Sequence, residues 1–184
     1  MTSATDLQKP VASPRSIAGT IGCVLVVAVC LTWAYLSMRS VMGVGGSCAD
    51  GGPYVSAQPC PDGSILIAPA IPLLIFFSML GTVVASSVGA PNLLVPMWGV
   101  LFGSLGWNFL EFSFKGPDIV WGWLVCGVVF WAMALPAFVF MLGGLRTSVA
   151  KRATDRGFLW IPAYGVIGAI GLLLGWWSYV AVAS

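Results

Sequence analysis

The sequence predicts an all-α membrane protein, a bundle of five transmembrane helices with the N-terminus in the cytoplasm and the C-terminus outside. Five apolar stretches occupy residues 17–38, 65–88, 93–114, 119–145 and 158–182. Each is long enough to cross the hydrocarbon core, which takes a helix of about 20 apolar residues. Charged residues make up only 8% of the 184 residues, against about 25% in soluble domains. The stretches also lack the alternation of apolar and polar residues that membrane β-strands show.

Basic residues determine the predicted orientation, because short loops rich in Lys and Arg stay on the cytoplasmic side. Six of the eight basic residues precede the first span or lie between the fourth and fifth: Lys9, Arg15, Arg146, Lys151, Arg152 and Arg156. A cytoplasmic N-terminus places all six inside. We therefore expect 146–157 to be a basic cytoplasmic loop that contacts anionic lipid headgroups.

The polar segment 1–16 precedes the first span and is expected to be a disordered cytoplasmic tail. The stretch 17–38 is longer than the 7–15 apolar residues of a signal peptide, so we expect it to stay as the first helix. No segment between spans reaches the roughly 50 residues of a small domain. Residues 17–184 are therefore predicted to form a single helical membrane domain.

The outer loop, 39–64, is rich in Gly and Pro and carries Cys48 and Cys60. The predicted topology places this loop in an oxidising compartment, so we expect the two cysteines to form a disulfide. Closing so short a loop stabilises the fold by about 3 kcal/mol. A redox enzyme is the other interpretation, but reactive thiols are usually spaced as C-x-x-C.

The remaining spans follow one another through short turns, which makes spans two, three and four antiparallel neighbours. Pairs of small residues recur at helix-packing spacing: Gly81 and Ala85, Gly99 and Gly103, Gly171 and Gly175. Small residues four apart let helix backbones approach closely in lipid. We favour packing within the bundle, with a homo-oligomer face or a face for a membrane-protein partner as the alternative.

One acid, Glu111, lies inside an apolar stretch, near the predicted outer end of span three. An ionisable residue at membrane depth is a functional hypothesis by default. Lys115 follows four residues later in the favourable order for an ion pair, and Arg39 is a second possible partner. Asn108 lies on the same helix face. We favour an ion pair at the membrane interface over a proton or cation carrier.

The chain contains no histidine, which removes bis-His haem, His-based zinc sites and His as a general base. It also lacks a phosphate-binding G-x-x-x-x-G-K-[ST] motif. We expect no cofactor, no metal site, no nucleic-acid partner and no enzymatic activity.

The outer-loop segments Cys48-Ala-Asp-Gly-Gly-Pro-Tyr54 and Cys60-Pro-Asp-Gly63 resemble the first outer loop of small, uncharacterised integral membrane proteins of high-GC Gram-positive bacteria. The resemblance covers about sixteen residues and the general layout of the spans. It implies a multi-pass protein of the bacterial cytoplasmic membrane and no known catalytic activity.

Two functions remain open. The first is a non-catalytic accessory or envelope component that acts through helix and outer-loop contacts, with the lipid bilayer as its one certain partner. The second is a small transporter or channel component that uses Glu111 in a polar spot of the outer leaflet. We favour the first, because few groups in the spans can carry chemistry.

Overall fold

A computed structural model describes residues 13–48, 58–150 and 156–184, with side chains in 13–48, 58–144 and 159–184. These ranges contain helices and no strands: α1 (Pro14–Gly43), the short 3-10 helix η1 (Ser64–Leu66), α2 (Ile67–Val88), α3 (Leu94–Ser113), α4 (Trp121–Ala150) and α5 (Arg156–Ala183). The predicted all-α class is therefore correct for the described chain. The tail 1–12, the loop centre 49–57 and the basic side chains of Arg146, Lys151, Arg152 and Arg156 lie outside the description.

Four of the described helices are long and apolar enough to cross a membrane: Pro14–Gly43, Ser64–Val88, Trp121–Gly144 and Leu159–Ala183. These are the helices of a membrane protein. The sequence predicted five such spans, and α3 is the one that does not reach the same hydropathy. Asn108, Glu111 and several glycines and tryptophans interrupt its apolar residues, which lowers its mean hydropathy although it is 20 residues long.

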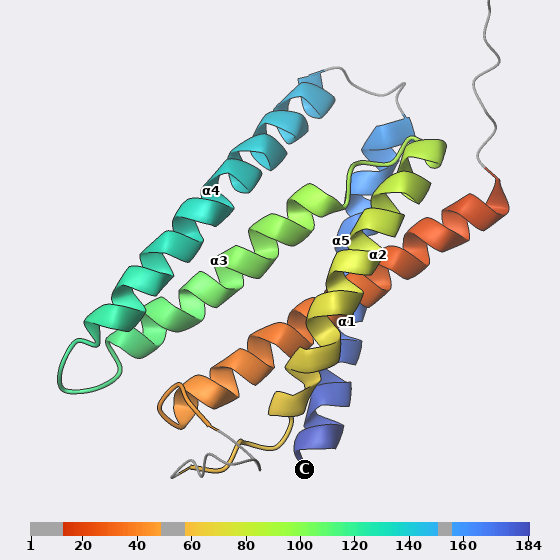
Figure 1. Ribbon diagram of the computed structural model, residues 1–184. Helices are drawn as coiled ribbons and strands as arrows, with labels where there is room; N and C mark the ends of the chain where they lie inside the picture. The colour runs from red at the N-terminus through yellow and green to blue at the C-terminus, as the bar shows by residue number, and fades with distance from the viewer. Residues whose placement is uncertain (1–12, 49–57, 151–155) are drawn as a thin grey trace, which may run out of the picture.

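Helix α1 is the centre of the fold. It packs against α2, α5 and α3, whereas α4 lies along α3 and hardly touches α5. Figure 1 shows the resulting division, with the α3–α4 hairpin on one side and α1, α2 and α5 on the other. The core is the buried face of α1, including Cys23, Val27 and Cys30, which meets Leu74 of α2 and Met97 of α3.

The helices alternate in direction, so the fold has two distinct ends. We call one the disulfide end, where α1, α3 and α5 finish and η1 and α4 begin (Figure 1). At the other end, α2 stops at Gly89, which adopts a left-handed φ of 70°. The Asn92 side chain then accepts hydrogen bonds from the Leu94 backbone at 2.7 Å and from Thr82 at 3.1 Å. These bonds fix the tight α2–α3 turn.

Glycines determine how closely α5 approaches α1. A Cβ atom built on Gly171 would lie 2.6 Å from the Ala28 Cβ and 2.8 Å from the Leu25 carbonyl oxygen. A Cβ on Gly175 would lie 2.7 Å from the Thr32 Cβ. Only hydrogen fits in these positions, so the predicted Gly171–Gly175 row packs inside the bundle.

Glycines also allow close approach at the α3–α4 interface. A Cβ on Gly99 would lie 3.3 Å from the Ala137 Cβ, and one on Gly103 would lie 3.1 Å from the Phe138 ring. This close approach lets α3 pack against α4 over most of the length of α3. Gly81 allows the close approach of α2 to α1, since a Cβ there would lie 2.9 Å from the Cys23 Cβ.

Helix α4 continues through Pro136, which cannot donate a backbone hydrogen bond. The indole N–H of Trp98, on α3, donates to the Met133 carbonyl at 3.2 Å, one turn before the proline. The carbonyl that loses its backbone donor to Pro136 is that of Ala132, four residues earlier. The Trp98 bond goes to the next carbonyl of the same turn and joins α3 to α4 beside the proline.

Candidate functional site

The most polar place within the described helices is an ion pair between α1 and α3 at the disulfide end. Two nitrogens of the Arg39 guanidinium each donate to one oxygen of the Glu111 carboxylate, both at 2.6 Å. The paired geometry matches the planar fork of arginine to the two oxygens of the acid. About a third of each side chain is exposed, 34% for Arg39 and 31% for Glu111.

Asn108 completes this polar site from beneath. Its side chain is fully buried. The Asn108 oxygen accepts a hydrogen bond from Arg39 at 3.3 Å, while its amide nitrogen donates to the Tyr35 carbonyl at 3.1 Å. Both halves of the buried amide are therefore bonded to α1, and the guanidinium is held in place for Glu111.

Lys115 is not the ion-pair partner of Glu111, although it is nearer in sequence. Its ammonium lies 4.5 Å from the centre of the Phe112 ring. The Arg39 guanidinium lies 5.5 Å from the same ring centre. Asn108 explains the choice, because it orients a rigid arginine fork toward Glu111, whereas a lysine must order a long flexible chain to reach the acid.

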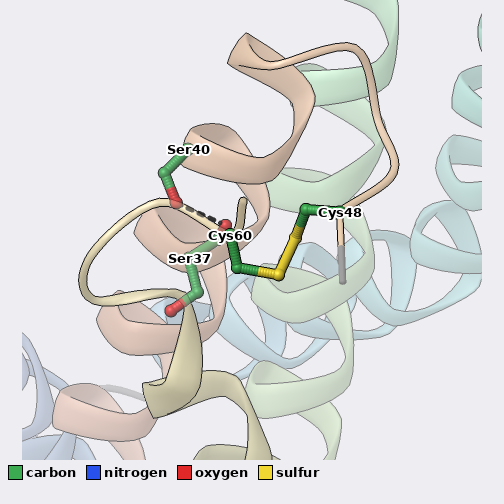
Figure 2. The surroundings of a disulfide bond; sticks show 4 residues. All are labelled: Ser37, Ser40, Cys48 and Cys60. Atoms are coloured by element: carbon green, nitrogen blue, oxygen red, sulfur yellow. Dashed lines mark hydrogen bonds between the residues drawn. A yellow bond between two sulfur atoms is a disulfide. The ribbon is translucent and has the colours of Figure 1, made fainter. Parts of the chain in front are cut away.

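The loop between α1 and η1 is closed by a disulfide at its two bases and is hydrogen-bonded to α1. Cys48 and Cys60 are joined in a disulfide, with their Cα atoms 4.9 Å apart. Figure 2 shows this bond beside Ser37 and Ser40 of the last turns of α1. Ser37, which is buried, donates to the Gly63 carbonyl at 3.1 Å. The segment that leads into η1 is thereby joined by the disulfide to the residues that follow α1, and by the hydrogen bond to α1 itself.

Both loop bases also contact aromatic rings of other helices. Gly63 has a positive φ of 83°, and a Cβ there would lie 2.9 Å from the Tyr179 ring of α5. Tyr179 in turn donates to the Leu36 carbonyl of α1 at 3.4 Å. A Cβ on Gly46 would lie 3.0 Å from the Trp123 ring of α4. The described parts of the loop therefore cover the ends of α1, α4 and α5.

The structure brings together most of the polar residues that the sequence pointed out. Arg39, Asn108 and Glu111 form one hydrogen-bonded network. Lys115 contacts the Phe112 ring, as Arg39 does, but it forms no hydrogen bond within this network. Sequence reasoning missed Ser37 and the hydrogen bond from Trp33 to Ser178 at 2.9 Å. Serines and tryptophans are common in membrane helices, so no local signal marks these as partners.

Chemically, this site joins helices and neutralises charge. Its carboxylate is paired, its amide is satisfied and the serines nearby donate to carbonyls. Across the described residues, no three His, Cys, Asp or Glu side chains gather as metal ligands do. The buried thiols of Cys23 and Cys30 lie in the α1 core, away from this network.

Comparison with known proteins adds no relative. No protein family, no curated protein and no solved structure matches the chain.

Proposed function

We propose that this chain is a non-catalytic, multi-pass protein of the bacterial cell membrane, an accessory or envelope component that acts by contact with another membrane component. The observation that carries the proposal is the paired state of Glu111, the one acid within the described apolar helices. A carrier needs a group that can exchange a proton or ion. Here the acid is bonded through both oxygens to an arginine of another helix.

The proposal includes five spans with the N-terminus inside and the C-terminus outside. Helix α3 has 20 residues, which gives a length of about 30 Å at 1.5 Å per residue. It packs lengthwise against α4, a membrane-capable helix, which supports a crossing of α3 beside α4. Asn108 and Glu111 lower its hydropathy, but both are bonded to α1 and are not presented bare to lipid. The positive-inside rule supports the orientation.

The helix faces that remain open are apolar. Val125, Val128 and Val139 of α4 are more than half exposed, as are Leu173 and Trp177 of α5. A bilayer covers such faces, and a second membrane protein can replace part of that lipid. The fastened outer loop is a further surface for contact, at the opposite side from the basic loop.

Purification tests the proposal directly. The full chain is extracted from its native membranes in a mild detergent, and the proteins that remain with it at fixed stoichiometry are identified. A constant protein partner supports an accessory role. A chain that runs alone and transports ions in liposomes would overturn it.

The Glu111→Gln variant separates contact from transport. Gln keeps the size of the side chain and removes its charge. If the variant reaches the membrane, keeps its partner and keeps function, a carrier role for Glu111 is excluded. If it folds and sorts normally but loses every phenotype, transport is favoured. Asp118→Asn is the matched control, since it also replaces a carboxylate by an amide, at an exposed residue of the α3–α4 turn outside the Arg39–Glu111 pair.

Orientation is tested with single engineered cysteines in intact cells. A thiol at Ser148 should be protected from a membrane-impermeant maleimide, whereas a thiol at Ser184 should react. The reverse pattern would show that the orientation is inverted.

A further inference from the structure

A groove of about 330 Å³ lies where α1, α3 and α5 meet, on the open side of the fold between α5 and α4. Eight residues line it: Leu31, Thr32, Tyr35 and Leu36 of α1, Val100 and Ser104 of α3, and Leu172 and Trp176 of α5. It exists because α4 follows α3 away from α5, so no helix fills the space beside α1.

The walls of the groove present carbon to an occupant, although three of the lining residues carry hydroxyls. The Tyr35 hydroxyl interacts with the Arg39 guanidinium, at the end of the groove. Thr32 donates its hydroxyl to the Ala28 carbonyl at 3.0 Å, and Ser104 donates to the Leu101 carbonyl at 3.0 Å. These bonds turn the oxygens back onto their own helices. Only an apolar occupant fits such a wall at membrane depth.

The groove is too small to hold a whole helix within it. A helix is about 10 Å wide and rises about 1.5 Å per residue, so a stretch of five residues takes up roughly 600 Å³. The groove offers about half of that volume. An acyl chain is much thinner than a helix and can lie along the groove, parallel to α3.

Two basic side chains, Arg39 and Lys115, lie beyond the groove at the disulfide end of the fold. Tyr35 lines the groove, and Arg39 follows one helical turn nearer the disulfide end. On α3 the same stripe runs from Ser104 through Asn108 to Glu111, and Lys115 follows in the turn just after α3 ends at Ser113. Arg39 and Lys115 both contact the Phe112 ring, and one carboxylate, Glu111, neutralises one of the two charges. Lys115 is exposed and pairs with no carboxylate in the described chain.

Arg39 keeps hydrogen-bonding capacity in this position. A guanidinium has five N–H donors. Three of them go to Glu111 and Asn108, and the side chain is 34% exposed. A phosphate oxygen at the mouth of the groove could therefore accept from Arg39 and from Lys115 together.

We propose that the groove binds one acyl chain of a phospholipid whose phosphate lies against Arg39 and Lys115. The two halves of the site match the two halves of such a lipid, since an apolar channel leads to a mouth with one net positive charge. The proposal rests on the membrane placement given above, but it requires no protein partner, so the two can fail separately.

The experiment is native mass spectrometry of the full chain in mild detergent, titrated with phosphatidylglycerol and, in parallel, with diacylglycerol of the same acyl chains. We expect one phosphatidylglycerol per chain, bound more tightly than diacylglycerol. Val100→Trp fills the groove and should weaken binding at least tenfold. The matched control is Val128→Trp on the lipid-facing side of α4, which lines no part of the groove.

A second groove-filling change, Leu172→Trp, comes from α5 and covers the case in which Val100→Trp does not fold. Lys115→Gln should weaken phosphatidylglycerol binding about fivefold, the usual effect of one basic residue beside anionic lipid, and leave diacylglycerol unchanged. Equal binding of the two lipids would overturn the proposal. So would unchanged binding in both groove-filling variants, or an equal loss in Val128→Trp.

Discussion

The contact between α1 and α5 can be tested by adding one methyl group. Gly171→Ala places a Cβ atom 2.6 Å from the Ala28 Cβ and 2.8 Å from the Leu25 carbonyl oxygen. Carbon atoms in good contact lie about 3.5–4.0 Å apart. The obstacle includes backbone, which cannot rotate away, so α5 must shift by roughly an ångström. That shift also strains the Trp33–Ser178 hydrogen bond on the next turns of the interface.

A second glycine on α5 supplies the control. A Cβ on Gly168 meets nothing within 4 Å, so Gly168→Ala changes helix propensity without adding a clash. Both variants share the propensity gain of alanine, which is up to about 1 kcal/mol. Their difference therefore isolates overpacking, which typically costs about 1–3 kcal/mol. We expect Gly171→Ala to be less stable than Gly168→Ala by that amount.

The assay is reversible unfolding in mild detergent titrated with a denaturing detergent, followed by circular dichroism or tryptophan fluorescence. The free energy of unfolding is compared between the two variants and the unmodified chain. Equal stability of the two variants would refute the close α1–α5 approach. It would also mean that the glycine row of α5 faces lipid or another chain, as the homo-oligomer alternative requires.

Three further predictions concern the polar groups and the disulfide. Arg39→Gln and Glu111→Gln should each lower the free energy of unfolding, because each single change leaves the other charge unpaired. The double variant should lose less stability than the sum of the two single losses. Unfolding of all three variants measures this coupling. A thiol titration of denatured, unreduced protein should find three free thiols, since the other two cysteines are joined, and Cys48→Ser should cost about 3 kcal/mol of stability. Trp98→Phe removes the donor to the Met133 carbonyl and should cost about 1 kcal/mol in the same unfolding assay.

Each of these predictions has a control and an outcome that contradicts it. Asp118→Asn, at an exposed residue outside the ion pair, should leave the unfolding free energy nearly unchanged. Additive effects of the Arg39 and Glu111 changes would show that the two side chains act independently. Five reactive thiols would show that Cys48 and Cys60 are reduced. Trp177→Phe, at a side chain that is 71% exposed, controls for the loss of an indole. An equal loss of unfolding free energy in the two tryptophan variants would show that the hydrogen bond to the Met133 carbonyl does not stabilise the chain.

Much of the fold could be predicted from the sequence. Membrane helices form all their backbone hydrogen bonds internally and can be recognised by their length and apolar composition. The predicted stretch 65–88 corresponds to η1 and α2 at Ser64–Val88, and 93–114 to α3 at Leu94–Ser113. The largest differences are at α1 and α4. Helix α1 covers Pro14–Gly43 where 17–38 was predicted, so Arg39 and Ser40 lie in the helix and not in the loop. Helix α4 covers Trp121–Ala150 where 119–145 was predicted. The apolar pattern reports membrane depth, and a helix can extend beyond the apolar part on a polar turn.

Three features can be concluded from the sequence alone: this chain is helical, its helices are apolar enough for a membrane, and Cys48 and Cys60 lie at the two bases of one loop. Which side chains meet depends on how the helices pack, and this is visible only in the folded chain. Arg39 and Glu111 are 72 residues apart in sequence, and no local pattern favours Arg39 over the nearer Lys115. The groove beside α1 is likewise a product of packing, because it depends on α4 following α3 rather than α5. Composition and periodicity act over a few helical turns, whereas these contacts depend on how whole helices are arranged around α1.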